Sequence, residues 1–230
     1  MPVIKTIDLK KYYNRGTELE VRALDGVNLE IDAGEFTAVV GPSGSGKTTL
    51  LNIIGGLDRP TGGKVYIDGK DISGLSENEM IDFRLHHIGF VFQAYNLIPV
   101  LSAYENAEFI MLLQGKTERE RRQRVTELLT AVGLEKQIDK RPAQMSGGQQ
   151  QRVAVARALA SKPKFVLADE PTANLDSKST TRLLDIMKRL NDDEGVTFIF
   201  STHDQRVIDR AKRVIYLDDG KIVKEILSSS

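Results

Sequence analysis

The sequence has no cysteine and no tryptophan, and its 230 residues carry no net charge because 32 basic residues balance 32 acidic ones. Without cysteine, the chain has no disulfide framework, no thiolate metal site and no thiol nucleophile. Without an excess of basic residues, it has no global electrostatic attraction for nucleic acid or for an anionic membrane surface. We therefore expect no nucleic-acid partner.

Long apolar segments are also missing. No run approaches the roughly 20 apolar residues that span a bilayer, and residues 1–6 lack the apolar core of a signal peptide. The apolar fraction of 40% and the charged fraction of 28% are those of an ordinary globular protein. We expect one large domain or two small ones in the cytoplasm, with any membrane role depending on a partner.

One glycine-rich stretch carries recognisable chemistry. Residues 41–48 are Gly-Pro-Ser-Gly-Ser-Gly-Lys-Thr, a complete Gly-x-x-x-x-Gly-Lys-Thr phosphate loop. The apolar residues 36–40 before it predict a buried strand, and residues 49–54 after it predict the first turns of a helix. In this context backbone N–H groups and the helix N-terminus surround a phosphate, Lys47 reaches the β- and γ-phosphates, and the Thr48 hydroxyl holds Mg²⁺. A glycine-rich turn without a ligand is the alternative, which the Lys-Thr pair disfavours.

A second apolar segment, residues 165–168, ends in the acids Asp169 and Glu170. Buried acids are costly unless they are paired or bound to a metal, so a strand that delivers two of them to the edge of a sheet indicates a site. In nucleotide hydrolases an aspartate here steadies Mg²⁺, and the following glutamate can orient or deprotonate the attacking water. An acidic turn is the alternative for this pair taken alone.

The segment Ser146-Gly-Gly-Gln149 precedes an alanine-rich helical stretch that ends near residue 160. Ser146 is a good N-cap, and the two glycines permit a ligand to approach the helix N-terminus closely. Taken alone, an ordinary capped helix explains this segment as well as a second anion site does.

Apolar periodicity predicts an α/β chain. Strands are expected at residues 3–9, 26–31, 64–68 and 90–92, and then at 164–168, 196–200, 214–217 and 221–224, with helices at 179–190 and 205–211. Between about residues 103 and 160 the pattern is helical, and Gly133 is the expected C-cap of a helix that starts at residue 117. The charged run at residues 116–124 is interpreted as the solvated start of that helix rather than an RNA-binding patch. Strands alternating with helices predict a parallel sheet with crossover connections.

In order and spacing, these motifs resemble the ATP-binding-cassette (ABC) ATPases. Gln93 matches the family's Q-loop, residues 174–176 match its D-loop, and His203 matches its switch histidine, so that the match runs from about residue 3 to residue 225. The resemblance implies an α/β fold with a phosphate-loop (RecA-like) core sheet, an antiparallel β subdomain and an inserted α-helical subdomain. It divides a single ABC ATPase domain into residues 1–93 and 161–227 for the β subdomain and core, 94–160 for the helical signature subdomain, and 228–230 for a tail.

The resemblance also assigns roles to single residues. Tyr13 is expected to stack on adenine, with the adjacent Tyr12 as the alternative; Glu170 is expected to polarise the attacking water, and His203 to bond the γ-phosphate. The expected catalytic residues are Glu170, His203, Lys47 and Gln93; the expected nucleotide-binding residues are Tyr13, Gly41, Ser43, Gly44, Ser45, Gly46, Lys47, Thr48, Thr49, Ser146, Gly147, Gly148 and Gln149; the expected Mg²⁺ ligands are Thr48, Gln93 and Asp169.

In this family the Ser-Gly-Gly-Gln loop docks on ATP held by a second subunit, so the resemblance implies a homodimer in the ATP-bound state that hydrolysis releases. It also implies separate membrane permease subunits, reached through the loop at Gln93, and hence a peripheral position on the inner face of the cell membrane. Residues 51–60 and 89–99 are similar to the ATPases that serve lipoprotein release and macrolide-type export. A small-solute importer ATPase is the alternative within the family, and a non-transport cassette protein or a phosphate-loop kinase are the alternatives outside it.

Overall fold

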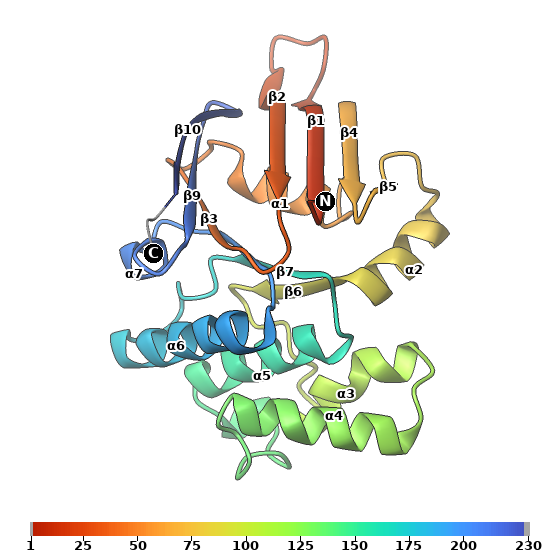
Figure 1. The fold of residues 1–230 in the computed structure, drawn as a ribbon, viewed down its shortest axis with the longest axis vertical. Helices are drawn as coiled ribbons and strands as arrows, with labels where there is room; N and C mark the ends of the chain where they lie inside the picture. The colour runs from red at the N-terminus through yellow and green to blue at the C-terminus, as the bar shows by residue number, and fades with distance from the viewer. Residues whose placement is uncertain (1, 228–230) are drawn as a thin grey trace.

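A computed structural model describes residues 2–227 of the chain, and the expected tail at residues 228–230 lies outside this range. An antiparallel sheet lies at one end of the molecule, a larger sheet crosses the middle, and long helices lie at the other end (Figure 1). The strands are β1 (Ile4–Tyr13), β2 (Val21–Ile31), β3 (Phe36–Val40), β4 (Gly62–Ile67), β5 (Lys70–Asp71), β6 (Ile88–Phe92), β7 (Phe165–Asp169), β8 (Phe198–Ser201), β9 (Arg213–Asp218) and β10 (Lys221–Leu227). The helices are α1 (Lys47–Ile54), α2 (Glu77–His87), α3 (Ala103–Leu113), α4 (Glu118–Ala131), the 3₁₀ turn η1 (Pro142–Gln144), α5 (Gly147–Ala160), α6 (Ser177–Glu194) and α7 (Gln205–Ile208).

The larger sheet has six strands in the order β10-β9-β3-β8-β7-β6. Its strands from β9 to β6 pair in parallel, and β10 joins the edge antiparallel to β9 through a turn at Asp219 and Gly220. The smaller sheet is antiparallel, with the order β2-β1-β4-β5. The predicted fold class, a RecA-like core sheet with an antiparallel β part and helices, is confirmed.

The six-stranded sheet separates two hydrophobic cores, because its central strands are buried on both faces. Phe36, Val166 and Phe200 face one core, which they share with the apolar sides of α3, α4, α5 and α6. Val39 and Leu167 face the other core, which includes α1 and the antiparallel sheet. Alternate residues of one strand therefore enter different cores, as the period of two in a strand requires. This double burial fixes the carboxyl ends of β3, β6 and β7 relative to one another.

The sequence pattern does not predict α2. Of its residues only Phe83 is buried, so it shows little apolar periodicity. A capping box at its start, formed by Ser76 and Glu79, is the signal that marks it. The expected helix at residues 205–211 is shorter, because α7 ends at Ile208 and the chain then turns so that the N–H of Lys212 bonds the carbonyl of Phe36 beside β9.

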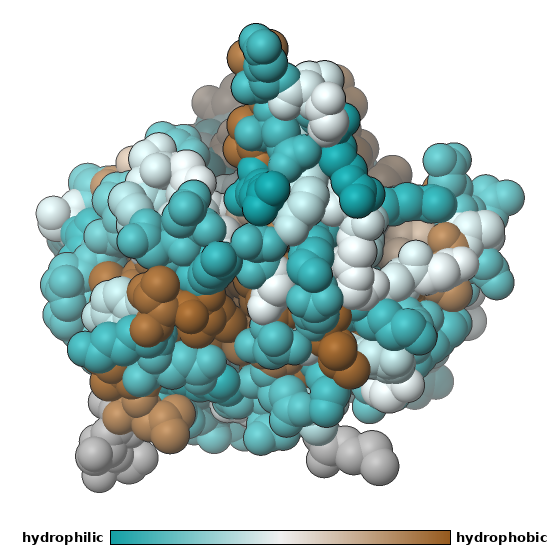
Figure 2. Space-filling model, turned by 90° about the horizontal axis from the view of Figure 1, so that it is seen from above, coloured by the Kyte–Doolittle hydropathy of each residue, from teal (hydrophilic) through white to brown (hydrophobic). Residues whose placement is uncertain are grey.

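The surface seen from the side of the antiparallel sheet is mainly hydrophilic, with separate hydrophobic patches (Figure 2). Exposed large apolar side chains include Leu19 and Val21 around the β1–β2 connection, Leu57 after α1, and Leu112 and Leu113 at the end of α3. Within residues 2–227, none of the helices has the length and apolarity needed to cross a membrane.

Candidate functional site

The phosphate loop lies between β3 and α1, at the carboxyl end of a central strand. Lys47 Nζ donates to the carbonyl of Gly41 at 2.9 Å and to that of Pro42 at 2.8 Å, so the loop curls around its own lysine. Helix α1 begins at Lys47, and its N-cap, Gly46, provides no side-chain hydrogen bond. The first N–H groups of α1 are therefore left for a ligand, and they add the positive end of the helix dipole to the charge of the lysine. This arrangement is suited to a phosphate chain.

Two glycines of the loop are required by close packing. A Cβ at Gly41 would lie 2.0 Å from the carbonyl oxygen of Leu217 in β9. A Cβ at Gly46 would lie 2.2 Å from the carbonyl oxygen of Ala23 in β2, and Gly46 has a φ of 102° that side-chain-bearing residues rarely adopt. The loop thus packs closely against the backbone of β2 and of β9, which leaves no room for a side chain at either glycine.

A hydroxyl and a carboxylate meet beside the loop. Thr48 Oγ1, in the first turn of α1, donates to Asp169 Oδ1, at the end of β7, at 3.3 Å. Strand β6 pairs with β7 so that Phe92 is opposite Asp169, which places Gln93 next to the same edge. The hydroxyl, the carboxylate and the amide are oxygen donors of the kind that Mg²⁺ prefers. Residues 2–227 contain no cluster of three or more His, Cys, Asp or Glu side chains that could hold a metal by themselves. The donor set fits Mg²⁺, which is commonly held by one or two protein groups together with water and substrate phosphates.

Glu170 and His203 form a second pair, just beyond the paired ends of β7 and β8. His203 Nδ1 lies 2.8 Å from Glu170 Oε1, and Thr202 Oγ1 donates to Glu170 Oε2 at 3.3 Å. The backbone N–H of Glu170 donates to the carbonyl of Ser201. The φ angle of Glu170 is 45°, a left-handed value that costs a non-glycine residue about 1–3 kcal/mol. The Glu170 side chain is 20% exposed and that of His203 is 77% exposed. The carboxylate is therefore held in place while the imidazole remains accessible to a ligand.

Asp204 supports the segments that carry Glu170 and His203, and it was not among the expected site residues. Arg206 donates to both of its carboxylate oxygens, at 2.9 and 2.7 Å, and Thr172 Oγ1 donates to Oδ2 at 2.9 Å. The hydrogen bonds from Arg206 hold the pKa of Asp204 at about 2. Since Thr172 follows Glu170 by two residues and Asp204 follows His203, this carboxylate ties the two segments together. The sequence signal was its place directly after His203.

The loop, Gln93, Glu170 and His203 open into one cleft of about 790 Å³. Tyr13 lines this cleft and its hydroxyl donates to Asp58, whereas the Tyr12 hydroxyl bonds Asp25 and Tyr12 does not line it. Among residues 2–227, those that line the cleft are Tyr13, Val21, Ala23, Gly41, Pro42, Ser43, Gly44, Gly46, Lys47, Thr48, Thr49, Gln93, Glu170, Ala173, Ser201 and His203.

Val21 and Ala23 were missed, because the sequence predicts a strand that begins only at residue 26. Strand β2 starts at Val21, which pairs directly with Tyr13 of β1. The pairing places an aliphatic side chain beside an aromatic ring at the mouth of the cleft, an arrangement suited to the flat face of a nucleobase. Ser45, by contrast, is a buried residue of the loop and is not among the described residues that line the cleft.

The signature segment, residues 146–149, lies elsewhere. Ser146 is the N-cap of α5, as predicted, and forms a capping box in which its hydroxyl accepts from Gln149 N and Gln149 Oε1 accepts from Ser146 N. A Cβ at Gly147 would lie 2.7 Å from the hydroxyl oxygen of Tyr95, and one at Gly148 would lie 2.7 Å from Ser179 Oγ. None of the four residues is among the described residues that line the cleft. The structure therefore separates the two glycine-rich segments within one chain.

Comparison with known proteins identifies the family. A family model described as ABC transporter matches residues 24–173. The chain belongs to the ABC transporter family. It is 48% identical over 221 residues to lipoprotein-releasing system ATP-binding protein LolD 1 of Rhodopseudomonas palustris, which covers 96% of this chain and 98% of that protein. It is 49% identical over 224 residues to macrolide export ATP-binding/permease protein MacB of Hyphomonas neptunium, which covers 97% of this chain but 34% of that protein.

A solved ABC cassette has the same architecture. The dimeric structure of a post-hydrolysis state of the ATP-binding cassette MJ0796, bound to ADP and Pi, superposes with a TM-score of 0.89 at 45% identity over 99% of both chains. The protein of that name comes from Methanocaldococcus jannaschii. The predicted family, the ABC ATPase class and the likeness to the lipoprotein-release and macrolide-export subgroup are confirmed.

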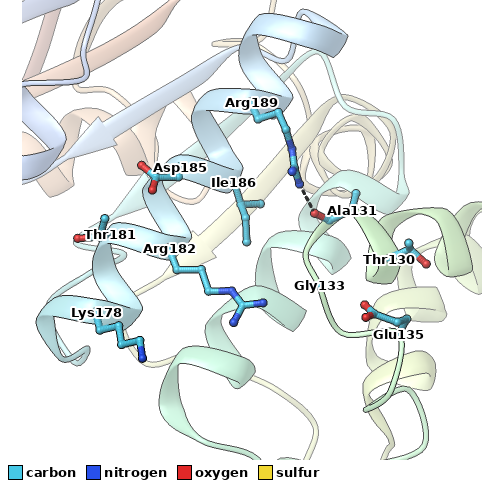
Figure 3. A pocket seen from close by; sticks show the side chains of 10 residues that line it. All are labelled: Thr130, Ala131, Gly133, Glu135, Lys178, Thr181, Arg182, Asp185, Ile186 and Arg189. Carbon is cyan, nitrogen blue, oxygen red and sulfur yellow. Dashed lines mark hydrogen bonds between the residues drawn. The ribbon is translucent and has the colours of Figure 1, made fainter.

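The cassette has a second hollow, of about 780 Å³, between the end of α4 and the side of α6 (Figure 3). Arg189 Nη2 donates to the carbonyl of Ala131 at 2.6 Å, and Arg152 Nη1 donates to those of Val132 and Gly133 at 2.7 and 3.0 Å. Ala131 is the last residue of α4, Val132 is its C-cap and Gly133 follows, so these carbonyls lie at the end of the helix, where carbonyls lack partners within it. The arginines therefore stabilise a helix C-terminus, and we assign this groove a structural role.

Proposed function

We propose that this chain is an ATPase subunit that hydrolyses ATP in a Mg²⁺-dependent reaction, pairs with a second copy when ATP is bound, and powers a separate membrane subunit. One observation carries the proposal. The phosphate loop, the Thr48–Asp169 pair and the Glu170–His203 pair converge on one edge of the central sheet. A nucleotide with its phosphates in the loop would thus lie close to both a metal position and a carboxylate–imidazole pair.

The proposed reaction is direct attack of water on the γ-phosphorus, without a covalent enzyme intermediate. The loop N–H groups and Lys47 bind the β- and γ-phosphates, and Glu170 orients the water and accepts its proton. Since His203 meets Glu170 through Nδ1, its Nε2 is the nitrogen that faces the γ-phosphate and steadies its developing charge. Thr48, Asp169 and Gln93 would hold Mg²⁺, which neutralises phosphate charge when bound.

The base is proposed to stack on Tyr13. The contacts of Tyr13 and Tyr12 support this choice, because Tyr13 lines the cleft beside Val21 and Ala23 whereas the Tyr12 hydroxyl is bound to Asp25. The aliphatic neighbours give the base an apolar setting, and the ring supplies an aromatic face.

The signature segment is proposed to serve the nucleotide of a second copy. Its four residues lie outside the cleft of their own chain, at the N-terminus of α5, where N–H groups and the helix dipole favour an anion. We further propose that residues 94–160 form a helical subdomain that presents this segment, and that residues 1–93 and 161–227 form the nucleotide-binding part. The dimeric structure of the MJ0796 cassette supports this assembly.

The membrane partner is proposed to be of the lipoprotein-release or macrolide-export type, which places the chain on the inner face of the membrane. Likeness to LolD 1 and MacB supports this choice, and MacB is named as an ATP-binding part and a permease in one protein. Recovery with the permease of a small-solute importer would contradict the subgroup and leave the ATPase proposal standing.

Phosphate release from ATP by the purified chain, without an acceptor substrate, tests the proposal directly. We expect turnover with Mg²⁺ that EDTA abolishes, and a strong loss in Thr48→Val, which removes the hydroxyl beside Asp169 without changing side-chain size. Turnover that survives EDTA would contradict the Mg²⁺ dependence. Absence of turnover by the chain, both alone and with its co-purified membrane protein, would contradict the function.

A further inference from the structure

Gln151 connects the helix of the signature segment to the backbone of two proposed site residues. It lies in α5, two residues after the signature segment, and it is fully buried. Its Nε2 donates to the carbonyl of Phe92 at 3.2 Å and to that of Pro171 at 2.7 Å. Phe92 directly precedes Gln93, and Pro171 directly follows Glu170. One side-chain amide thus holds the chain next to both residues.

The chain geometry makes this link stiff. Phe92 is the last residue of β6 and pairs with Asp169 in β7, so its carbonyl cannot move without disturbing the sheet. Beyond it, Asn174 Nδ2 donates to the carbonyl of Gln93 at 3.1 Å, which ties the Q-loop to the segment that follows Pro171. An amide NH₂ has two hydrogens and can donate to both carbonyls at once, whereas an apolar side chain of the same length removes this donor from both.

We propose that Gln151 is a positioning residue for ATP hydrolysis. It links the position of the signature segment to the positions of Gln93 and Glu170. The signature segment serves the nucleotide of the second copy, whereas Gln93 and Glu170 act on the nucleotide of their own chain. A shift of α5 when the dimer closes reaches both residues through one buried side chain. This inference rests on the proposed function and adds to it the element that makes hydrolysis in one site depend on docking at the other.

A purely structural role is the competing explanation, and the chain offers a matched control for it. Asn191 in α6 is also buried, and its Nδ2 also donates to two backbone carbonyls, those of Gly34 at 2.8 Å and Val196 at 2.7 Å. In both residues the amide oxygen has no hydrogen-bond partner within residues 2–227. Neither Gly34 nor Val196 adjoins a proposed site residue, so Asn191 reproduces the burial and the bonding of Gln151 without its location.

The test compares Gln151→Met with Asn191→Leu, because each replaces a buried amide by an apolar side chain of similar size. Melting temperature, Kd for ATP and kcat per folded molecule are measured for both and for the wild type. We expect both variants to melt earlier and to keep Kd within about twofold, while kcat falls roughly 10- to 100-fold in Gln151→Met alone, since small displacements of reacting groups cost that much. Equal loss of kcat in the two variants, or a wild-type kcat in Gln151→Met, would overturn the inference.

A second variant guards against failure to fold. Gln151→Asn keeps the amide but is one methylene shorter, so it can reach at most one of the two carbonyls, and we expect a kcat between those of the wild type and Gln151→Met. If Gln151→Met does not fold, a kcat in Gln151→Asn equal to that of the wild type would overturn the inference. A wild type that releases no phosphate would refute the proposed function itself, so the two failures are distinguishable.

Discussion

Replacing the carboxylate of Glu170 by an amide should stop the reaction without removing the nucleotide. Glutamine has the same shape, and the backbone bond from residue 170 to the carbonyl of Ser201 does not involve the side chain, so the geometry of the cleft should persist. What is lost is the proton acceptor and the negative charge that faces His203 at 2.8 Å. A general base contributes roughly 10²- to 10⁴-fold to the rate, which corresponds to about 3–5 kcal/mol of barrier.

Phosphate release and sizing chromatography measure the two halves of this prediction. Glu170→Gln should bind ATP with unchanged Kd, turn over 10²- to 10⁴-fold more slowly, and elute with ATP as a dimer, because the contacts that ATP provides are no longer removed. Glu194→Gln changes an exposed carboxylate at the end of α6 and should behave as the wild type in both assays. Near-normal turnover in Glu170→Gln would refute the assignment of this residue as the base.

Three further predictions concern assembly, folding and pH. Ser146→Arg should leave ATP binding by the monomer intact and abolish ATP-driven dimerisation; loss of ATP binding by the monomer would show that the signature segment serves its own chain. Gly46→Ala should lower the free energy of unfolding by about 3 kcal/mol or more, measured by denaturant titration, whereas Gly74→Ala, with no atom within 4 Å of the added Cβ, should change it little. Arg206 lowers the pKa of Asp204 from 3.8 to about 2. This carboxylate should therefore contribute up to about 2 kcal/mol to the free energy of unfolding above pH 4, and the contribution should be lost as the pH falls toward 2. Asp204→Asn should flatten that part of the plot of unfolding free energy against pH, and an unchanged plot would contradict the pairing.

The loop, the acidic strand end and the capped helix were predictable because each is a local pattern. Residues 41–48 occupy the predicted strand–loop–helix unit, Asp169 ends β7, and Ser146 caps α5. Local chemistry is sufficient in each case, since a loop needs glycine where other chains approach, and a helix start needs a side-chain acceptor.

The rest could not be predicted because it depends on partners distant in the sequence. Helix α2 buries little of its surface and so leaves no apolar period, and the start of β2 is set by its pairing with β1. The choice between Tyr13 and Tyr12 depends on which side of β1 faces the cleft. Nothing in an alanine-rich helical sequence distinguishes Gln151, which bonds carbonyls 59 and 20 residues away, from the exposed positions of such a helix.

The sequence by itself determined that this chain is an ABC cassette with a phosphate loop, two acids at a strand end and a separate signature segment. Each of these motifs consists of residues that are neighbours along the chain, so it can be recognised without a structure. Only the tertiary structure decided which side chains meet. Parallel strands bring their carboxyl ends to one edge, so Thr48 reaches Asp169 across 121 residues and His203 reaches Glu170 across 33, while the signature segment stays outside the cleft. That separation arises from the packing of α5 beneath the sheet, and packing is a property that spacing along the chain does not record.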